Sequence, residues 1–520
     1  MIARKKQVHN RVLVSCILGF YSLLAVITLF RAKNSSTIPT LVKSLEDPEL
    51  YLSFFREHFP FLHTALVSSF GFYGADVAVF SFWVALSSIA AICLFTLFKK
   101  RTKISPWALV LIVFSAIVLS RKYYELATFS GIRNVLSSQS SWWSRFFQPG
   151  LSLGCMLLVQ TLIENLPLSN KKRCLALLAI AFCSAVIPTY PWIALIYSVF
   201  LLCSLLVPNT FLEIRIYALI CILLSLTLKF LGTHPDLVTR VGAYSSIWPE
   251  PITFRNTLIV AVLLLFFIKQ PLAKFLLGFQ LSTLAAQFSS IRGFTVEPDH
   301  FQLIHLITVP GIVVLFIEKY KFDQKWKFAQ WAFGLILAGI AVIGLRSELS
   351  WKHPSFYSIP KEYVEVVKNV TFSCGPHKPY EYFYSSDAYL NWTLPARTRC
   401  KNILHMGRLD WNLSNQEIAT RYLASKMFYE HKSRSAALHE TLEDLKFLGS
   451  SHHEWSRDLT KSTALERRQD HMLWYGFLSG FYLPSQANHL KKLFFSANVN
   501  LEIKQLKEFK VLNLPLVELR

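Results

Sequence analysis

The chain has 520 residues, of which 53% are hydrophobic and 17% are charged. In soluble proteins about a quarter of all residues are charged, so the low charged fraction of this chain argues against an ordinary soluble fold. The net charge of +22 would fit a nucleic-acid-binding protein, but residues 346–520 hold only 24 Lys and Arg against 18 Asp and Glu. Most of the excess therefore flanks the apolar segments before residue 346, where membrane topology accounts for it.

Up to about residue 345, apolar residues form blocks of about 17 to 22 residues with almost no internal charge, the length a helix needs to cross about 30 Å of hydrocarbon. The sequence predicts an α-helical polytopic membrane protein with about eleven transmembrane helices in residues 1–345. A small extracytoplasmic α/β domain is expected in residues 346–520. The expected spans are 13–30, 77–98, 105–121, 148–165, 174–189, 191–207, 212–231, 256–268, 271–289, 301–317 and 329–345.

Basic residues alternate between the loops in a way that fixes the expected orientation. Cytoplasmic loops carry an excess of Lys and Arg, so the N-terminus is predicted to be cytoplasmic and the C-terminal domain extracytoplasmic, in a bacterial inner membrane. The long loops 31–76, 122–147, 232–255 and 290–300 then face outward. The clusters that define the inner side are Arg4, Lys5, Lys6 and Arg11; Lys99, Lys100, Arg101 and Lys103; Lys171, Lys172 and Arg173; and Lys319, Lys321, Lys325 and Lys327.

The C-terminal domain mixes strand-like and helical runs. Residues 380–384, 401–406 and 511–514 are typical of strands. The sequence Ser414-Asn415-Gln416-Glu417 matches a capping box that opens a helix running to about residue 431. Cys374 and Cys400 are the two cysteines of this domain, and they are a candidate disulfide if the domain faces an oxidising compartment.

Several catalytic motifs are absent from the sequence. It contains no G-x-x-x-x-G-K-[ST] phosphate loop, no H-E-x-x-H helix, no C-x-x-C pair and no G-x-S-x-G elbow. ATP-driven transport by this chain alone, zincin-type proteolysis and thiol redox chemistry are therefore disfavoured.

Carboxylates in the first outer loop are the leading catalytic candidates. Glu46-Asp47-Pro48-Glu49 precedes an amphipathic segment that is expected to lie along the membrane interface. Asp47 or Glu49 there could act as a general base on an acceptor hydroxyl, or help to hold a divalent cation such as Mg²⁺ or Mn²⁺. The alternative is a helix N-terminus, in which Asp47 is the N-cap and Pro48 the first helical residue.

Basic residues and histidines in the other outer loops are candidate substrate-binding groups. Arg145, Arg255 and Arg292 could each bind a lipid phosphate bidentately, and Asp299 and His300 could move a proton beside it. The alternatives are an interfacial anchor for Arg145 next to Trp142 and Trp143, and ordinary loop positions for the others. His305 is also unusual, because polar groups at membrane depth usually face an interior or a cavity.

This layout resembles the GT-C class of integral membrane glycosyltransferases, which combine a cytoplasmic N-terminus, an acidic motif in a long first outer loop and, often, an extracytoplasmic C-terminal domain. The resemblance implies a polyprenyl-phosphate-linked sugar donor that is used on the extracytoplasmic face. Asp47 would take the position of the family's catalytic acid and Glu49 that of its neighbour. Arg292, Arg145 or Arg255 would neutralise the phosphate of the leaving lipid.

The sequence is also compatible with two other functions. One is a transporter or flippase for a lipid-linked or polar substrate, which would place ionisable residues deep in its spans. The other is a non-catalytic membrane scaffold for envelope assembly. The expected partners are membrane lipid and the lipid-linked donor, and no nucleic acid.

Overall fold

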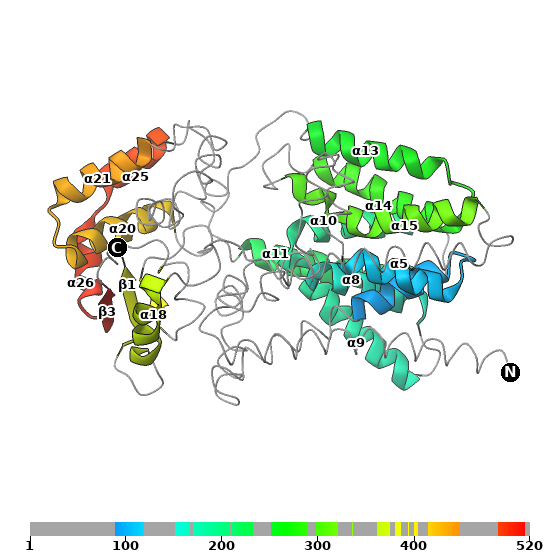
Figure 1. Cartoon of the computed structure of the whole chain (residues 1–520), viewed down its shortest axis with the longest axis horizontal. Coiled ribbons are helices and arrows are strands. Elements are labelled where there is room, and N and C mark those ends of the chain that lie inside the picture. The colour runs from blue at the N-terminus through cyan, green and yellow to red at the C-terminus, as the bar shows by residue number, and fades with distance from the viewer. Residues whose placement is uncertain are drawn as a thin grey trace.

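The computed structural model shows two groups of secondary-structure elements, coloured blue to green and yellow to red in Figure 1. We refer to them as the helical body and the C-terminal unit. The described residues are 89–118, 151–166, 170–206, 211–231, 251–288, 298–320, 335, 361–374, 380–385, 390, 394, 400–403, 414–446 and 487–514.

Prolines define where several helices of the helical body begin. Pro106, Pro191, Pro251 and Pro271 are each the first residue of a helix, a position where the missing backbone N–H would have no intrahelical partner anyway. The elements are an unlabelled helix Ile89–Lys99, α5 Pro106–Val118, α8 Ser152–Glu164, α9 Asn170–Val186, η3 Ile187–Thr189, α10 Pro191–Leu205, α11 Leu212–Leu231, α13 Pro251–Leu265, α14 Pro271–Gln287, η5 Pro298–Ile304 and α15 His305–Lys319.

The expectation of about eleven transmembrane helices is wrong. Among the described residues, one helical stretch, His300–Lys319, is long and apolar enough to cross a membrane. Although α11 has the 20 residues of the expected span 212–231, other described helices are short: α8 has 13 residues, α10 and α13 have 15 each, and α14 has 17. At 1.5 Å per residue such helices extend about 20 to 26 Å, short of a hydrocarbon layer of about 30 Å.

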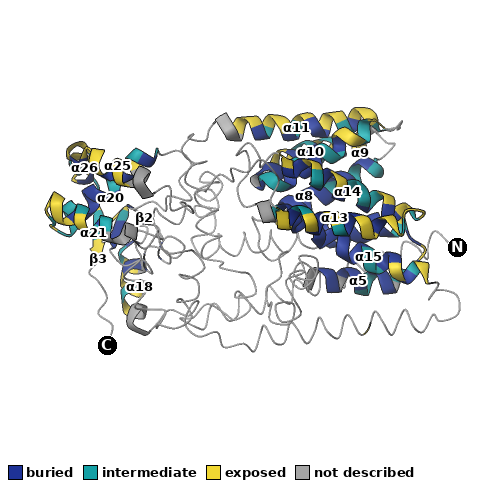
Figure 2. Cartoon of the chain, turned by 90° about the horizontal axis from the view of Figure 1, so that it is seen from above, coloured by how far each residue is buried: buried dark blue, intermediate teal, exposed yellow. Residues whose placement is uncertain are grey.

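Helix α14 lies at the centre of the helical body, where it contacts α10, α13, α15 and η5. Aromatic rings fill the contact with α10: the rings of Phe200 and Phe279 stack with centroids 4.1 Å apart, and Phe275 meets both edge-on. The outer surface is also apolar, with exposed residues along α11 visible in Figure 2. Leu178 and Phe182 of α9 and Leu228 of α11 are 61%, 65% and 62% exposed.

Charged and polar contacts join one loop to the ends of two helices at one end of the helical body. Glu164 at the end of α8 pairs with Arg101 and, at 3.6 Å, with Lys100. Glu318 near the end of α15 accepts hydrogen bonds from the Thr102 hydroxyl, at 3.0 Å, and from the backbone N–H of Lys103. The basic loop 99–103 therefore joins the C-terminal ends of α8 and α15.

The C-terminal unit contains a three-stranded parallel sheet in the order β2-β1-β3. Its strands overlap the three runs that the sequence identified as strand-like, and β1 is the central strand. Helix α20 contacts α21, α25 and α26 beside it. The elements are α18 Lys361–Ser373, β1 Tyr382–Ser385, β2 Lys401–Asn402, α20 Asn415–Tyr429, α21 Arg434–Lys446, α25 Ala487–Ser496, α26 Val499–Leu506 and β3 Val511–Leu514.

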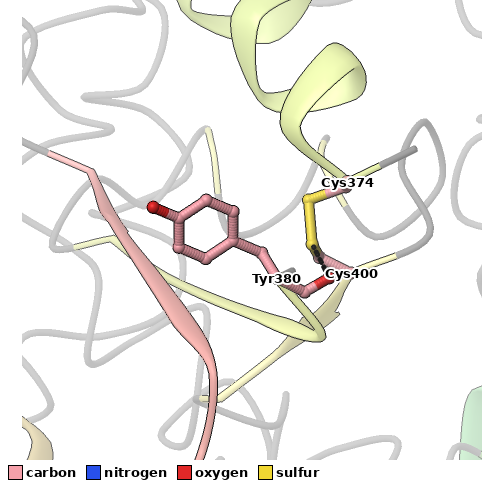
Figure 3. The surroundings of a disulfide bond; sticks show 3 residues. All are labelled: Cys374, Tyr380 and Cys400. Carbon is pink, nitrogen blue, oxygen red and sulfur yellow. Dashed lines mark hydrogen bonds between the residues drawn. A yellow bond between two sulfur atoms is a disulfide. The ribbon is translucent and has the colours of Figure 1, made fainter. Parts of the chain in front are cut away.

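Two local features of the C-terminal unit match the sequence closely. The capping box is confirmed: the Ser414 hydroxyl accepts from the Glu417 backbone N–H at 3.1 Å, and the Glu417 carboxylate accepts from the Ser414 N–H at 2.7 Å. Cys374 and Cys400 form a disulfide that ties the end of α18 to the residue before β2 (Figure 3). Their Cα atoms are 5.4 Å apart, an ordinary separation for such a bond.

Candidate functional site

The candidate residues of the sequence fall only partly within the described structure. Asp47, Glu49, Arg145 and Arg292 lie outside the described residues. Asp299 lies in η5, but its side chain is outside the described part. Arg255 and His300 are described, and they form the candidate site together with the groups around them.

Arg255 lies in the second turn of α13 with its side chain exposed. Among the described residues, its guanidinium contacts the side-chain oxygen of the neighbouring Asn256, at 3.3 Å from Nη2 and 3.4 Å from Nε. No carboxylate of the described residues pairs with it. Arg255 therefore presents most of its hydrogen-bond donors outward, where an anion could take them up in the bidentate geometry that guanidinium favours.

A buried polar network lies directly behind Arg255. Thr253 and Asn256 of α13 both bond to Gln302 of η5: the Gln302 amide nitrogen donates to the Thr253 hydroxyl at 3.0 Å, and its oxygen accepts from Asn256 at 3.2 Å. All three side chains are at most 3% exposed. Because both atoms of the Gln302 amide have partners, the network avoids the cost of about 1–3 kcal/mol for an unsatisfied buried polar group.

Helix α14 extends this polar network deeper into the helical body. The Gln287 amide donates to the Thr257 hydroxyl of α13 at 2.9 Å, and the Gln280 amide donates to the Thr308 hydroxyl of α15 at 2.8 Å. Gln280 and Gln287 are seven residues apart, about two helical turns, and so lie on one face of α14. The four side chains are buried and connect α13, α14 and α15 through directional bonds inside an otherwise apolar body.

His300 at the start of η5 is held by aromatic rings from the beginning of α10. Its ring stacks on Tyr190 with centroids 5.6 Å apart, and it meets the edge of Trp192 at 4.7 Å. Since η5 also packs against α13, His300 and Arg255 lie on neighbouring elements. The described contacts of the two residues nevertheless go to different partners, α10 for His300 and Asn256 for Arg255.

His305, the first residue of α15, is completely buried. Neither of its ring nitrogens has a hydrogen-bond partner among the described residues. It follows Gln302 by three residues and precedes Thr308 by three, so these three polar groups run along one side of the η5–α15 segment. A buried imidazole of this kind is uncommon in an apolar helix and marks an interior position rather than a lipid-facing one.

The residues of the site that were not predicted from the sequence are uncharged. Thr253, Asn256 and Thr257 have the i, i+3, i+4 spacing of one helical face, and that pattern was readable without a structure. These residues carry no charge, so they were not among the predicted site residues, and the predicted span began only at residue 256. No cluster of three or more His, Cys, Asp or Glu side chains that could hold a metal ion occurs among the described residues.

Comparisons with known proteins assign no family to this arrangement. No protein-family model matches the chain, and no curated protein resembles it in sequence.

Proposed function

We propose that this protein is a glycosyltransferase that works at a membrane and uses a polyprenyl-phosphate-linked sugar donor on the extracytoplasmic side. The observation that carries the proposal is the exposed guanidinium of Arg255 in front of a buried, hydrogen-bonded polar network. A cation at the edge of an apolar body suits a donor that carries both a lipid chain and an anionic phosphate group. The layout of the sequence, which resembles the GT-C class, gives the proposal its reaction class.

Contact with lipid is supported by the outer surface of the helical body. Leu175 of α9 is 70% exposed, and apolar side chains such as Phe182 and Leu228 are exposed on the neighbouring helices α9 and α11. Soluble monomers rarely expose large contiguous apolar patches, whereas a lipid-facing surface carries them at no cost. A hydrocarbon environment also explains why so many polar side chains are directed inward.

An oxidising environment for the C-terminal unit is supported by the disulfide between Cys374 and Cys400. Disulfides persist outside the cytosol and are rare within it. This agrees with the orientation expected from the basic loops, in which the C-terminal unit and residues 232–255 share the extracytoplasmic side.

The proposed reaction assigns one task to each candidate group. Asp47 accepts the proton of the acceptor hydroxyl as its oxygen attacks the anomeric carbon of the sugar. The bond between that carbon and the phosphate oxygen breaks, and the lipid phosphate leaves with the electron pair. Arg255, with Arg292 or Arg145, stabilises the negative charge that grows on the phosphate, an effect that is strong where water is excluded.

The test is a transfer assay on full-length protein in proteoliposomes, with a panel of radiolabelled polyprenyl-phosphate sugars. Asp47→Asn is expected to lower the transfer rate by roughly 10²- to 10⁴-fold, and Arg255→Ala to lower it by roughly 10²- to 10³-fold. Lys274→Ala, a change at an exposed position in the first turn of α14, is the control and should leave the rate unchanged. Wild-type protein that transfers no sugar, with unchanged glycans in an Asp47→Asn strain, would reject the proposal.

A transporter is the second candidate, and His305 is the observation that favours it. Fully buried, with no hydrogen-bond partner for either ring nitrogen among the described residues, it lies between Gln302 and Thr308. Polar groups at such positions often line substrate pathways. Uptake of a lipid-linked or polar substrate into proteoliposomes that is lost in His305→Leu, without any sugar transfer, would favour transport over catalysis.

A further inference from the structure

The exposed sides of α25 and of α26 each combine lysine with an isolated large apolar residue. Lys491, Lys492 and Phe495 are exposed on α25, and Leu501 and Lys504 are exposed on α26. Phe495 is 57% and Leu501 is 65% exposed. We call these five residues the α25–α26 surface.

Helical spacing places each apolar residue of this surface next to a lysine. Phe495 follows Lys491 by four residues and Lys492 by three, and Lys504 follows Leu501 by three. Residues at these separations are neighbours on one face of a helix. Both helices therefore present an apolar side chain beside lysine, two lysines on α25 and one on α26, an arrangement in which lysine stems can lie along an apolar phase while their charges stay in water.

The opposite faces of the same helices are already used for packing. Phe494, Val499 and Leu506 are buried in the contact with α20, and Glu502 of α26 pairs with Arg421 of α20 at 2.8 Å. The exposed face therefore contributes little to the hydrophobic core of the C-terminal unit. Its side chains are therefore available for contacts outside that core.

The sequence before α25 is rich in aromatic residues, and the sequence after α26 is rich in lysine. Residues 472–483, shortly before α25, contain five aromatic residues and no charged one, a composition that is typical of membrane interfaces. After α26, Lys507 and Lys510 are exposed, with Glu508 as the one exposed acid among residues 491–510. The region as a whole is basic and rich in large apolar residues.

We propose that the α25–α26 surface docks on an anionic phospholipid surface, with Phe495 and Leu501 in the headgroup layer and the lysines on lipid phosphates. The choice of lysine distinguishes lipid from a protein partner, because protein interfaces are depleted in lysine and enriched in Arg, Tyr and Trp. Interfacial segments instead combine lysines with Phe or Leu and gain affinity from both the buried apolar area and the anionic lipids. The proposal goes beyond sugar transfer and does not depend on it.

The test is hydrogen–deuterium exchange of the full-length protein reconstituted with phosphatidylcholine alone or with equal parts of phosphatidylcholine and phosphatidylglycerol. We expect backbone amides of residues 487–510 to exchange roughly tenfold more slowly with the anionic lipid. The difference should shrink at high salt, because lysine–phosphate attraction at a surface is screened.

Two pairs of variants separate lipid docking from general effects on the fold. Lys504→Glu should abolish most of the lipid-dependent protection, whereas Lys368→Glu, the same change at an exposed lysine of α18, should leave it intact. Phe495→Ser should weaken it, whereas Phe372→Ser on α18 should not. Equal exchange of residues 487–510 in both lipids would overturn the proposal, as would protection that Lys504→Glu and Lys368→Glu reduce alike.

Discussion

Gln302 and Asn256 join η5 to α13 through a hydrogen bond of 3.2 Å inside the helical body. The bond connects residues that are 46 positions apart and sits directly behind the exposed Arg255. It therefore couples the placement of a candidate substrate-binding residue to the packing of two elements.

Loss of the Gln302 amide should destabilise the protein measurably. Gln302→Leu is expected to lower the free energy of unfolding by about 1–3 kcal/mol, because the Asn256 amide and the Thr253 hydroxyl each lose this buried partner. Thermal unfolding of the full-length protein, followed by tryptophan fluorescence, measures the change. Leu258→Ala on the exposed side of α13 is the control, with an expected change within about 0.5 kcal/mol. Equal effects of the two variants would contradict the expectation.

Removal of the disulfide should weaken the C-terminal unit. Its cysteines are 26 residues apart, and for a loop of this size the loss of the cross-link is expected to cost about 3 kcal/mol. Cys374→Ser/Cys400→Ser should therefore unfold at a lower urea concentration than the wild type. Cys174→Ser, which removes an exposed free cysteine, is the control. Identical urea midpoints for the double variant and the control would show that the bond does not form.

A charged network between α20 and α21 should make the C-terminal unit sensitive to acid. Lys426 Nζ lies 2.9 Å from Glu440, and Lys432 pairs with both Glu440 and Glu430. Burial raises the pKa of Glu440, but the hydrogen bonds and charges of Lys432 and Lys426 outweigh it, so that its pKa is lowered overall. A carboxyl with a lowered pKa stabilises the fold above its ordinary pKa of about 4.3, and this stabilisation is lost as the pH falls through the folded value.

The opposite sign applies to Lys432. Burial lowers the pKa of its ammonium group, but Glu430 and Glu440 raise it overall, so its contribution is complete below the ordinary value of about 10.4 and is lost as the pH rises through the folded value. The acid sensitivity is tested with Glu440→Gln, which should reduce the fall in the free energy of unfolding below about pH 4.3. Because Glu440 is 42% exposed, the effect should stay below about 1 kcal/mol. An unchanged acid profile would contradict this role.

Close packing of α14 against α15 should make Gly311 intolerant of a side chain. A Cβ atom at this position would overlap Leu276 Cδ1, and Leu276 is fully buried with little room to move. Gly311→Ala is expected to lower stability by about 1–3 kcal/mol, the usual cost of overpacking. Leu276→Ala in the same chain should relieve the overlap, so the double variant should be more stable than the sum of the two single effects. Strict additivity in thermal unfolding would argue against the contact.

The features that could be predicted from sequence are local. The capping box of Ser414 and Glu417 is specified by four consecutive residues, and short runs rich in aromatic and β-branched residues marked the three strands. The pairing of Cys374 with Cys400 was open because a disulfide depends on a Cα separation that spacing along the chain does not reveal.

The features that could not be predicted depend on tertiary contacts. Long apolar blocks indicated long spans, but hydropathy does not show where a helix ends, and α8, α10 and α14 are shorter than the expected spans 148–165, 191–207 and 271–289. Gln302 pairs with Asn256 only because η5 folds against α13, so neither residue stood out as part of a site. Asp47, Glu49, Arg145 and Arg292 lie outside the described residues, and their roles stay predictions.

The order of strands in the sheet determines how long β1 waits for its neighbouring strand during synthesis. β1 needs both β2 and β3 as neighbours, but β3 follows it by more than a hundred residues. At a translation rate of about 5–20 residues per second, one edge of β1 stays without its partner for roughly ten seconds. During that interval Tyr382 to Ser385 present an open strand edge to other chains, so a factor that shields nascent strands would affect the yield of this protein more than its final stability.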